Sequence, residues 1–162
     1  MKTHDQFVTD LNRSRQSLNN LALAASEAGF SLLIKPSSTA PDRESRNAHR
    51  DKGDAVIVAP IEHKHRVDLE FTCRKDYKFD TVIVDEQYKI DEKGPKDRPL
   101  MYVILNSDET HAAVVYGWTR KHWRVENLPD GKAGRRGNFY TCRKDVVRFC
   151  PVDRIFWSEP DQ

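Results

Sequence analysis

Residues 54–74 constrain the fold of this chain most, because an apolar run is followed there by a strictly alternating one. Residues 54–60 read Asp-Ala-Val-Ile-Val-Ala-Pro, and residues 67–74 read Val-Asp-Leu-Glu-Phe-Thr-Cys-Arg. Successive residues of a β-strand point to opposite faces of the sheet, so residues 67–74 give one apolar and one polar face. A short polar segment separates the two runs. We therefore predict an antiparallel hairpin with one face buried.

Two carboxylates stand out in this hairpin. Asp54 opens the first strand, and Glu70 lies on the polar face of the second. In an antiparallel hairpin these two positions can meet across the strands. Charge beside a core is costly unless it is paired, and two convergent carboxylates offer the oxygen ligands that Mg²⁺ prefers. The alternative interpretation is an ordinary half-exposed hairpin whose polar face is solvated.

Composition indicates a soluble, single-domain protein of the cytoplasm. The 162 residues suffice for one core, and a net charge of +2 excludes binding to nucleic acid by bulk charge alone. The three cysteines show no CxxC spacing, which favours a reducing compartment over a disulfide framework. The sequence has neither a signal peptide nor a membrane-spanning run, so we expect no membrane association.

The remaining sequence predicts an α+β fold. Apolar residues three, four or seven apart between residues 4 and 28 indicate an amphipathic helix, followed by Gly29 as a stop. We expect this N-terminal helix to pack on a central mixed or antiparallel sheet of about five strands. Further apolar runs lie at 30–35 (a strand or the end of the helical unit), 81–85, 100–106 and 111–117.

Two segments between these runs carry further expectations. Residues 86–92 are expected to begin a short helix, and the runs at 100–106 and 111–117 to form a hairpin. Residues 127–138 contain three glycines and a proline, so we predict a loop there. Its basic residues are Lys132, Arg135 and Arg136.

The acidic hairpin and the residues after it resemble the PD-(D/E)XK nuclease superfamily, especially its small phage-borne members. The stretch 77–89, Tyr-Lys-Phe-Asp-Thr-Val-Ile-Val-Asp-Glu-Gln-Tyr-Lys, is similar to the segment that follows the acidic strand in those proteins. The resemblance covers roughly residues 54–117 and implies a restriction-endonuclease-like core. The expected divisions of the single domain (1–162) are a helical unit at 1–35, a polar loop at 36–53, the nuclease-like core at 54–126, and a basic loop and C-terminal segment at 127–162.

The resemblance implies a phage-encoded endonuclease that acts on DNA with Mg²⁺ or Mn²⁺. Asp54 and Glu70 would be catalytic and would hold the metal, and a lysine two places after the second acid would steady the phosphate charge. This chain has Thr72 at that place, so Lys75 or Lys89 would supply the amine, with Lys64 as a further source.

Thr72 also favours an alternative function, in which the nuclease fold is catalytically inactive and binds nucleic acid or a host protein. A homodimer is compatible with either function. A third interpretation is a structural or interaction protein with no role on nucleic acid.

Two other alignments of the acidic motif exist. Residues 62–64 are a literal Glu-x-Lys but fall where the hairpin should turn, and residues 41–42 are a literal Pro-Asp in a loop-like segment. We prefer Asp54 with Glu70, because both lie at the edges of apolar strands. Glu27, near the end of the first helix, resembles a helix glutamate that some members place beside the metal. Its alternative interpretation is a solvated helix residue.

Residues 120–124 combine three cations, a histidine and a tryptophan. Such a cluster can contact phosphates and stack on an unpaired base. The alternative is a tryptophan edge amid ordinary surface charge. Together with the basic loop, the residues predicted to bind nucleic acid are Arg120, Lys121, Trp123, Arg135 and Arg136.

Overall fold

The computed structural model describes residues 4–35, 55–58, 66–72, 77, 79–130 and 135–156. Its helices and strands are α1 (His4–Glu27), β1 (Ser31–Ile34), β2 (Ala55–Val58), β3 (Arg66–Thr72), β4 (Thr81–Glu86), α2 (Gln87–Asp91), β5 (Met101–Leu105), β6 (His111–Tyr116), β7 (Trp123–Pro129), β8 (Arg136–Arg143) and β9 (Arg148–Pro151). Short 3₁₀ helices are η2 (Gly117–His122), η3 (Lys144–Val146) and η4 (Val152–Arg154).

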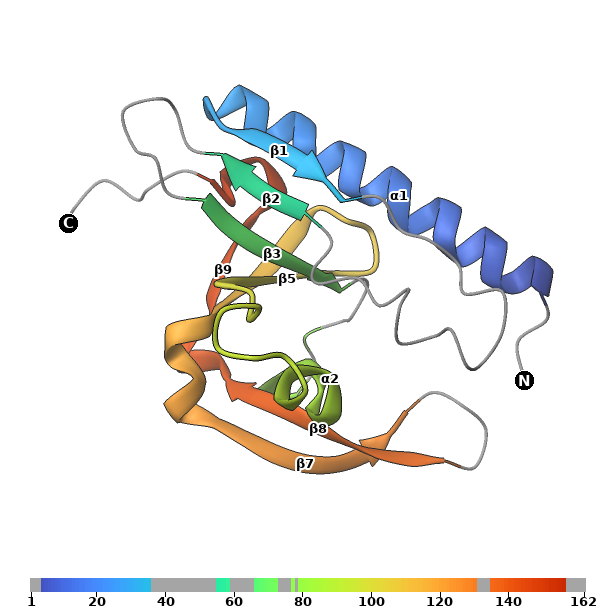
Figure 1. The fold of residues 1–162 in the computed structure, drawn as a ribbon, viewed down its shortest axis with the longest axis vertical. Helices are drawn as coiled ribbons and strands as arrows, with labels where there is room; N and C mark the ends of the chain where they lie inside the picture. Colours follow the sequence, from blue (N-terminus) through green and yellow to red (C-terminus); the bar gives the residue numbers. More distant parts are fainter. Residues whose placement is uncertain are drawn as a thin grey trace.

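The described strands form two sheets. The larger has the order β1-β2-β3-β5-β6-β9, and the smaller has the order β4-β8-β7. Every pairing is antiparallel except that of β3 with β5, which is parallel. A parallel pair needs a crossover connection, and the segment between these two strands carries β4 and α2. Figure 1 shows α1 along one side of the larger sheet, with the smaller sheet at the opposite end.

The N-terminal helix forms where its apolar stripe predicts it. Leu18, Leu21 and Ala25 of α1 are buried. The helix ends beside Gly29, whose φ of 82° is a left-handed conformation that glycine adopts at little cost. The next residue returns toward the helix, because the Phe30 N–H donates to the Ala25 carbonyl over 2.8 Å. The predicted helix and its stop are therefore confirmed.

Strands β5 and β6 are the centre of the molecule, because both of their faces are covered. On one face Met101, Val103 and Leu105 pack in a core cluster with the buried residues of α1. On the other face Tyr102 and Ile104 pack against β4, α2 and β8 in a second cluster. Burial on both faces explains why these strands read as continuous apolar runs rather than alternating ones.

The described hairpins confirm much of the expected fold. Ala55 pairs with Leu69 and Val58 with Arg66, so β2 and β3 are antiparallel neighbours as predicted. The strand at 30–35, the strand at 81–85, the short helix after it and the β5–β6 hairpin also form. The broad α+β class is confirmed, although the strands divide between two sheets rather than one sheet of about five.

The prediction of a loop at 127–138 is wrong at both ends of that segment. Pairs run from Trp123↔Cys142 to Pro129↔Arg136, so β7 extends to residue 129 and β8 begins at residue 136. Cross-strand bonds compensate for the poor strand propensity of its residues: the Asn127 side-chain amide donates to the Asn138 side-chain oxygen over 2.9 Å. The boundary expected between residues 126 and 127 consequently falls inside β7.

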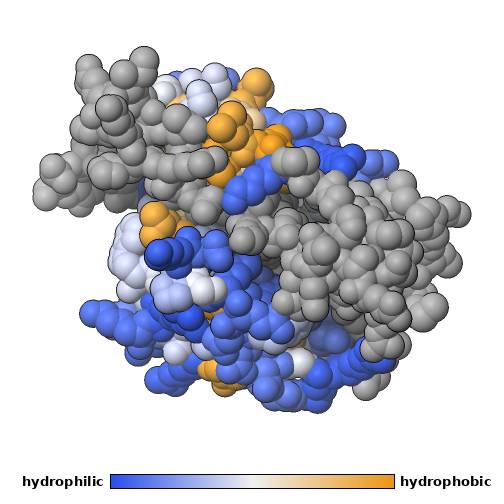
Figure 2. All heavy atoms as spheres, in the orientation of Figure 1, coloured by the Kyte–Doolittle hydropathy of each residue, from blue (hydrophilic) through white to orange (hydrophobic). Residues whose placement is uncertain are grey.

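The surface over the smaller sheet is polar. Figure 2 shows that the part of this face over α2, β7 and β8 is mostly hydrophilic. Among the described residues, no helix is long and apolar enough to cross a membrane.

Candidate functional site

The predicted acidic pair is described only at its second member. Glu70 lies in β3 between two strands, and the pairing register sets it level with Tyr102 of the parallel neighbour β5. Residues at matching positions of paired strands share a sheet face, so position 70 belongs to the face that turns toward the smaller sheet. Asp54 and Lys75 lie outside the described residues, and of Glu70 only the backbone is described.

Lys89, a candidate for the catalytic amine, lies in α2 and is held by two carboxylates. Its Nζ is 2.9 Å from Glu86 Oε2 and 3.5 Å from Asp85 Oδ1. Burial acts to lower the pKa of Lys89, but these two carboxylates raise it more, so the net pKa lies above the ordinary lysine value. Lys89 therefore carries its positive charge at any physiological pH.

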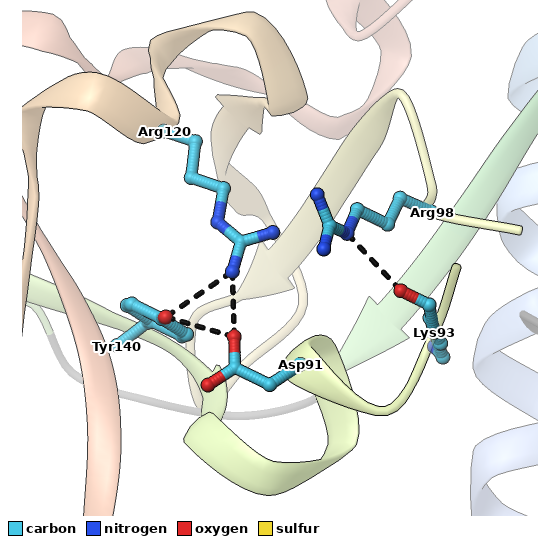
Figure 3. A network of polar contacts seen from close by, with 5 residues as sticks. All are labelled: Asp91, Lys93, Arg98, Arg120 and Tyr140. Atoms are coloured by element: carbon cyan, nitrogen blue, oxygen red, sulfur yellow. Dashed lines mark hydrogen bonds and ion pairs between the residues drawn. The ribbon is translucent and has the colours of Figure 1, made fainter. Parts of the chain in front are cut away.

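Arg120, predicted to bind nucleic acid, belongs to a network that joins three elements (Figure 3). Its Nη2 donates to Asp91 Oδ1 over 2.6 Å and to the Tyr140 hydroxyl over 3.1 Å. The Tyr140 hydroxyl in turn donates to Asp91 Oδ1 over 2.9 Å. The three residues come from η2, α2 and β8, so the network fastens the short helix to the smaller sheet.

The network shifts the pKa of both charged members. The hydrogen bond from Tyr140 is the largest cause that holds the pKa of Asp91 below its ordinary value, and Gln87 and Arg120 act in the same direction. Burial acts to lower the pKa of Arg120, while Tyr140 and Asp91 raise it above its ordinary value. The Arg120 guanidinium also lies over the Tyr140 ring, 5.1 Å from its centroid.

A second arginine lies beside this network. Arg98 Nε donates to the Lys93 carbonyl over 3.2 Å, and Figure 3 shows the Arg98 and Arg120 guanidinium groups turned toward one another. Arg120 Nη1 is buried without a hydrogen-bond partner among the described residues. The two guanidinium groups bring positive charge together beside the network. An unsatisfied buried donor costs about 1–3 kcal/mol, so the unpaired Arg120 Nη1 lowers the stability of the fold.

An open pocket of about 520 Å³ lies beside Asp91. Its lining combines two acids, an amide from α2, an exposed tyrosine and an amide from β8: Asp91, Glu92, Gln87, Tyr88 and Asn138. The lining holds no cation, so it does not suit a phosphate group.

The other residues predicted to bind nucleic acid are placed in different surroundings. Trp123 is only 9% exposed, and its ring packs edge-on against Tyr102 with the ring centroids 5.5 Å apart. Its indole Nε1 donates to Thr119 Oγ1 over 3.0 Å. The Trp123 ring is therefore closed to a stacking base in this conformation.

Three exposed cations remain from the prediction. Lys121 is exposed at the end of η2, and Arg135 and Arg136 are exposed at the start of β8. Arg136 is tethered across the hairpin, because its Nε donates to Asn127 Oδ1 over 2.7 Å. Lys121 and the two arginines lie at opposite ends of the β7–β8 hairpin, since β7 begins directly after η2.

The predicted Mg²⁺ pair remains a prediction. Within the described ranges, no three His, Cys, Asp or Glu side chains gather closely enough to hold a metal ion. The chemistry of the proposed donors fits a hard divalent cation, because both are carboxylates.

Comparison with known proteins adds no relatives. No protein-family model, no curated protein and no solved structure matches this chain.

Sequence reasoning did not find the partners of Arg120. Asp91 and Tyr140 lie 29 and 20 residues away from it. The available signal was weak: Asp91 stands near the end of an expected helix, and Tyr140 lies in the C-terminal segment. Neither position indicates by itself which cation it meets.

Proposed function

We propose that this protein is a metal-dependent nuclease-like protein that acts on DNA, built on a restriction-endonuclease-like core. The observation that carries the proposal is the position of Glu70. It lies in β3, one residue beyond the Ala55↔Leu69 pair, and on the sheet face that turns toward the smaller sheet. Asp54 immediately precedes Ala55 in the sequence, as a shared carboxylate site requires.

Asp54 and Glu70 are the proposed metal ligands. A divalent cation held there would supply Lewis-acid stabilisation to a phosphodiester. The rest of the chain would bind and orient the nucleic-acid backbone.

Lys89 is proposed to contribute charge rather than proton transfer. Its raised pKa keeps the ammonium protonated, which excludes it as a general base near neutral pH. A fixed ammonium can still stabilise negative charge on a phosphate. Lys75 is the other proposed source of this amine.

The proposed DNA contacts are the cations that the structure leaves at the surface. Lys121 and Arg135 are exposed, and exposed cations of this kind contact phosphates without reading sequence. Arg120 is proposed to act indirectly on DNA binding. Its ion pair with Asp91 fixes the η2 segment, from which Lys121 projects.

A cleavage assay tests the enzyme. Wild type is incubated with supercoiled plasmid and with single-stranded DNA in Mg²⁺ or Mn²⁺, with chelator as the blank. Asp54→Ala and Glu70→Ala are expected to abolish cutting while leaving the fold intact. The matched control is Asp153→Ala, because Asp153 is an exposed carboxylate in η4, near α1. Equal cutting by all four proteins contradicts the proposed site.

A second candidate function is a nucleic-acid-binding or host-protein-binding module without chemistry. Two observations favour it: Thr72 stands where an amine is expected, and Lys89 is already neutralised by Asp85 and Glu86. Wild type that binds DNA but cuts neither substrate in either metal supports this module over the enzyme.

A further inference from the structure

An exposed indole lies close to the basic end of η2. Trp118 is 66% exposed, although tryptophan usually buries most of its large ring. One face of the ring is stacked on Tyr116, with centroids 4.2 Å apart and planes inclined by 14°. The other face is left open, so the two rings form a layered platform at the surface.

The platform is fixed to the core rather than mobile. Tyr116 ends β6 and packs against the core cluster beneath α1. The Gly117 N–H donates to the Leu100 carbonyl over 2.7 Å. Thr119 Oγ1 donates to the Tyr116 carbonyl over 2.7 Å and accepts the Trp123 indole N–H. A ring held in this way loses little conformational freedom when a ligand stacks on it.

Positive charge lies on the same face of η2 as the open ring. Side chains three residues apart in a 3₁₀ helix eclipse one another, which sets Lys121 over Trp118. Lys121 is exposed, and Arg124 is exposed two residues after the helix ends. An aromatic face with cations along one edge complements a base joined to a negatively charged backbone.

We infer that Trp118 is a stacking platform for an unpaired base of single-stranded DNA, and that Lys121 contacts the adjoining phosphate. This inference rests on the proposed function for the choice of DNA. The base is assigned to Trp118 and the adjoining phosphate to Lys121, because the ring and the ammonium group are neighbours on one face of η2. A base within a duplex is already stacked on both sides, so the platform favours single strands.

Two other aromatic side chains, one exposed and one buried, serve as comparisons. Phe79 is 75% exposed, but no stacked partner ring is described for it. Trp123 is buried, with its ring edge-on to Tyr102 and tilted against Tyr140. Among the described aromatic side chains, Trp118 thus combines exposure, a stacked support and adjacent cations.

The test is fluorescence anisotropy of a labelled oligothymidylate of about ten nucleotides, titrated with the full chain in chelator to prevent cutting. Trp118→Leu keeps an apolar side chain but removes the ring, and it is expected to weaken binding about 5- to 150-fold. Trp118→Phe keeps an aromatic face and is expected to retain most of the affinity. Phe79→Leu is the matched control and should bind as wild type does.

Lys121→Ala gives an independent readout. The slope of log K against log salt is expected to fall by about 0.7, the value for one phosphate contact on a single strand. A blunt duplex of the same length is expected to bind more weakly than the single strand and to be insensitive to Trp118→Leu. An RNA oligomer that binds more tightly than the DNA one overturns the choice of DNA.

The outcomes separate this inference from the proposed function. Wild type that binds single strands through Trp118 but never cuts DNA supports the platform and overturns the nuclease. Wild type that cuts DNA, with unchanged binding and cutting in Trp118→Leu, supports the nuclease and overturns the platform. No binding of any oligonucleotide by folded wild type, or equal affinities for Trp118→Leu and Trp118→Phe, also overturns the platform.

Discussion

Asp91 and Arg120 form an ion pair in which Oδ1 lies 2.6 Å from Nη2, although 29 residues separate them in the sequence. Tyr140 donates to the same carboxylate oxygen. The contact joins α2 to η2 and β8, so it orders the region that carries Lys89 on one side and Lys121 on the other.

Asp91→Asn should lower stability near neutral pH by about 0.5–1 kcal/mol, because the pair is partly exposed and screened by water. The folded-state pKa of Asp91 is depressed, so the stabilisation is present above the unfolded-state pKa and disappears as pH falls through the folded-state value. Urea denaturation of both proteins at neutral and acidic pH measures this, and the difference should shrink in acid.

The control for that substitution is Asp145→Asn. Asp145 also lies 2.6 Å from an arginine, but its partner Arg143 is two residues away and both side chains are exposed. We expect a change within about 0.5 kcal/mol. Equal losses in the two variants would contradict a special role for the network around Asp91.

Tyr77→Phe should cost about 1–3 kcal/mol. The Tyr77 hydroxyl donates to the Ile104 carbonyl over 2.5 Å and accepts the Ala113 N–H over 2.9 Å, so its loss removes two hydrogen bonds to the backbone of the central strands. Tyr88→Phe, at an exposed tyrosine, is the matched control and should change little. Thermal unfolding of both variants measures the difference.

The same tyrosine should titrate late. Desolvation by burial raises the pKa of Tyr77 to about 12, so the neutral phenol stabilises the fold fully below pH 10 and progressively less as pH rises toward 12. Ultraviolet absorbance should show the same number of phenols ionising in the ordinary range in wild type and in Tyr77→Phe, because the Tyr77 phenol of the wild type ionises only at higher pH. A Tyr77 that ionises near pH 10 would contradict the buried hydroxyl.

Gly117→Ala should destabilise the protein by about 1–3 kcal/mol. A Cβ at this position would lie 2.8 Å from the Pro99 carbonyl oxygen, a backbone atom that cannot move aside without disturbing the start of β5. Gly94→Ala is the control, because nothing lies within 4 Å of its added Cβ. That substitution should leave stability unchanged or raise it by about 0.4–1 kcal/mol.

If Lys89 supplies the catalytic charge, Lys89→Ala should lower the cleavage rate about 100-fold, and Lys89→Arg should retain most of it. The pH–rate profile should show no basic limb from this group below pH 9, because its pKa is raised. Lys96→Ala, at an exposed lysine outside α2, is the control. Wild-type cleavage by Lys89→Ala, with loss in Lys75→Ala, would assign the amine to Lys75.

Local pattern predicted most of the elements of the fold but not their extent. The stripe of α1, the alternation of β3 and the apolar runs of β4, β5 and β6 are set by neighbouring residues, which the sequence displays directly. The β7–β8 extension was missed because glycine and asparagine have low strand propensity. The Asn127–Asn138 bond that supports it joins residues on two different strands.

The sequence by itself determined the α+β class and placed a cluster of cations around a tryptophan at residues 120–124, close to Trp118. Only the tertiary structure decided which of these side chains remain open. Arg120 is engaged by Asp91, Trp123 is buried against Tyr102, and Trp118 is exposed on Tyr116. The physical reason is that burial and ion pairing depend on residues brought together by folding, whereas helix and strand periodicity depend on residues adjacent along the chain.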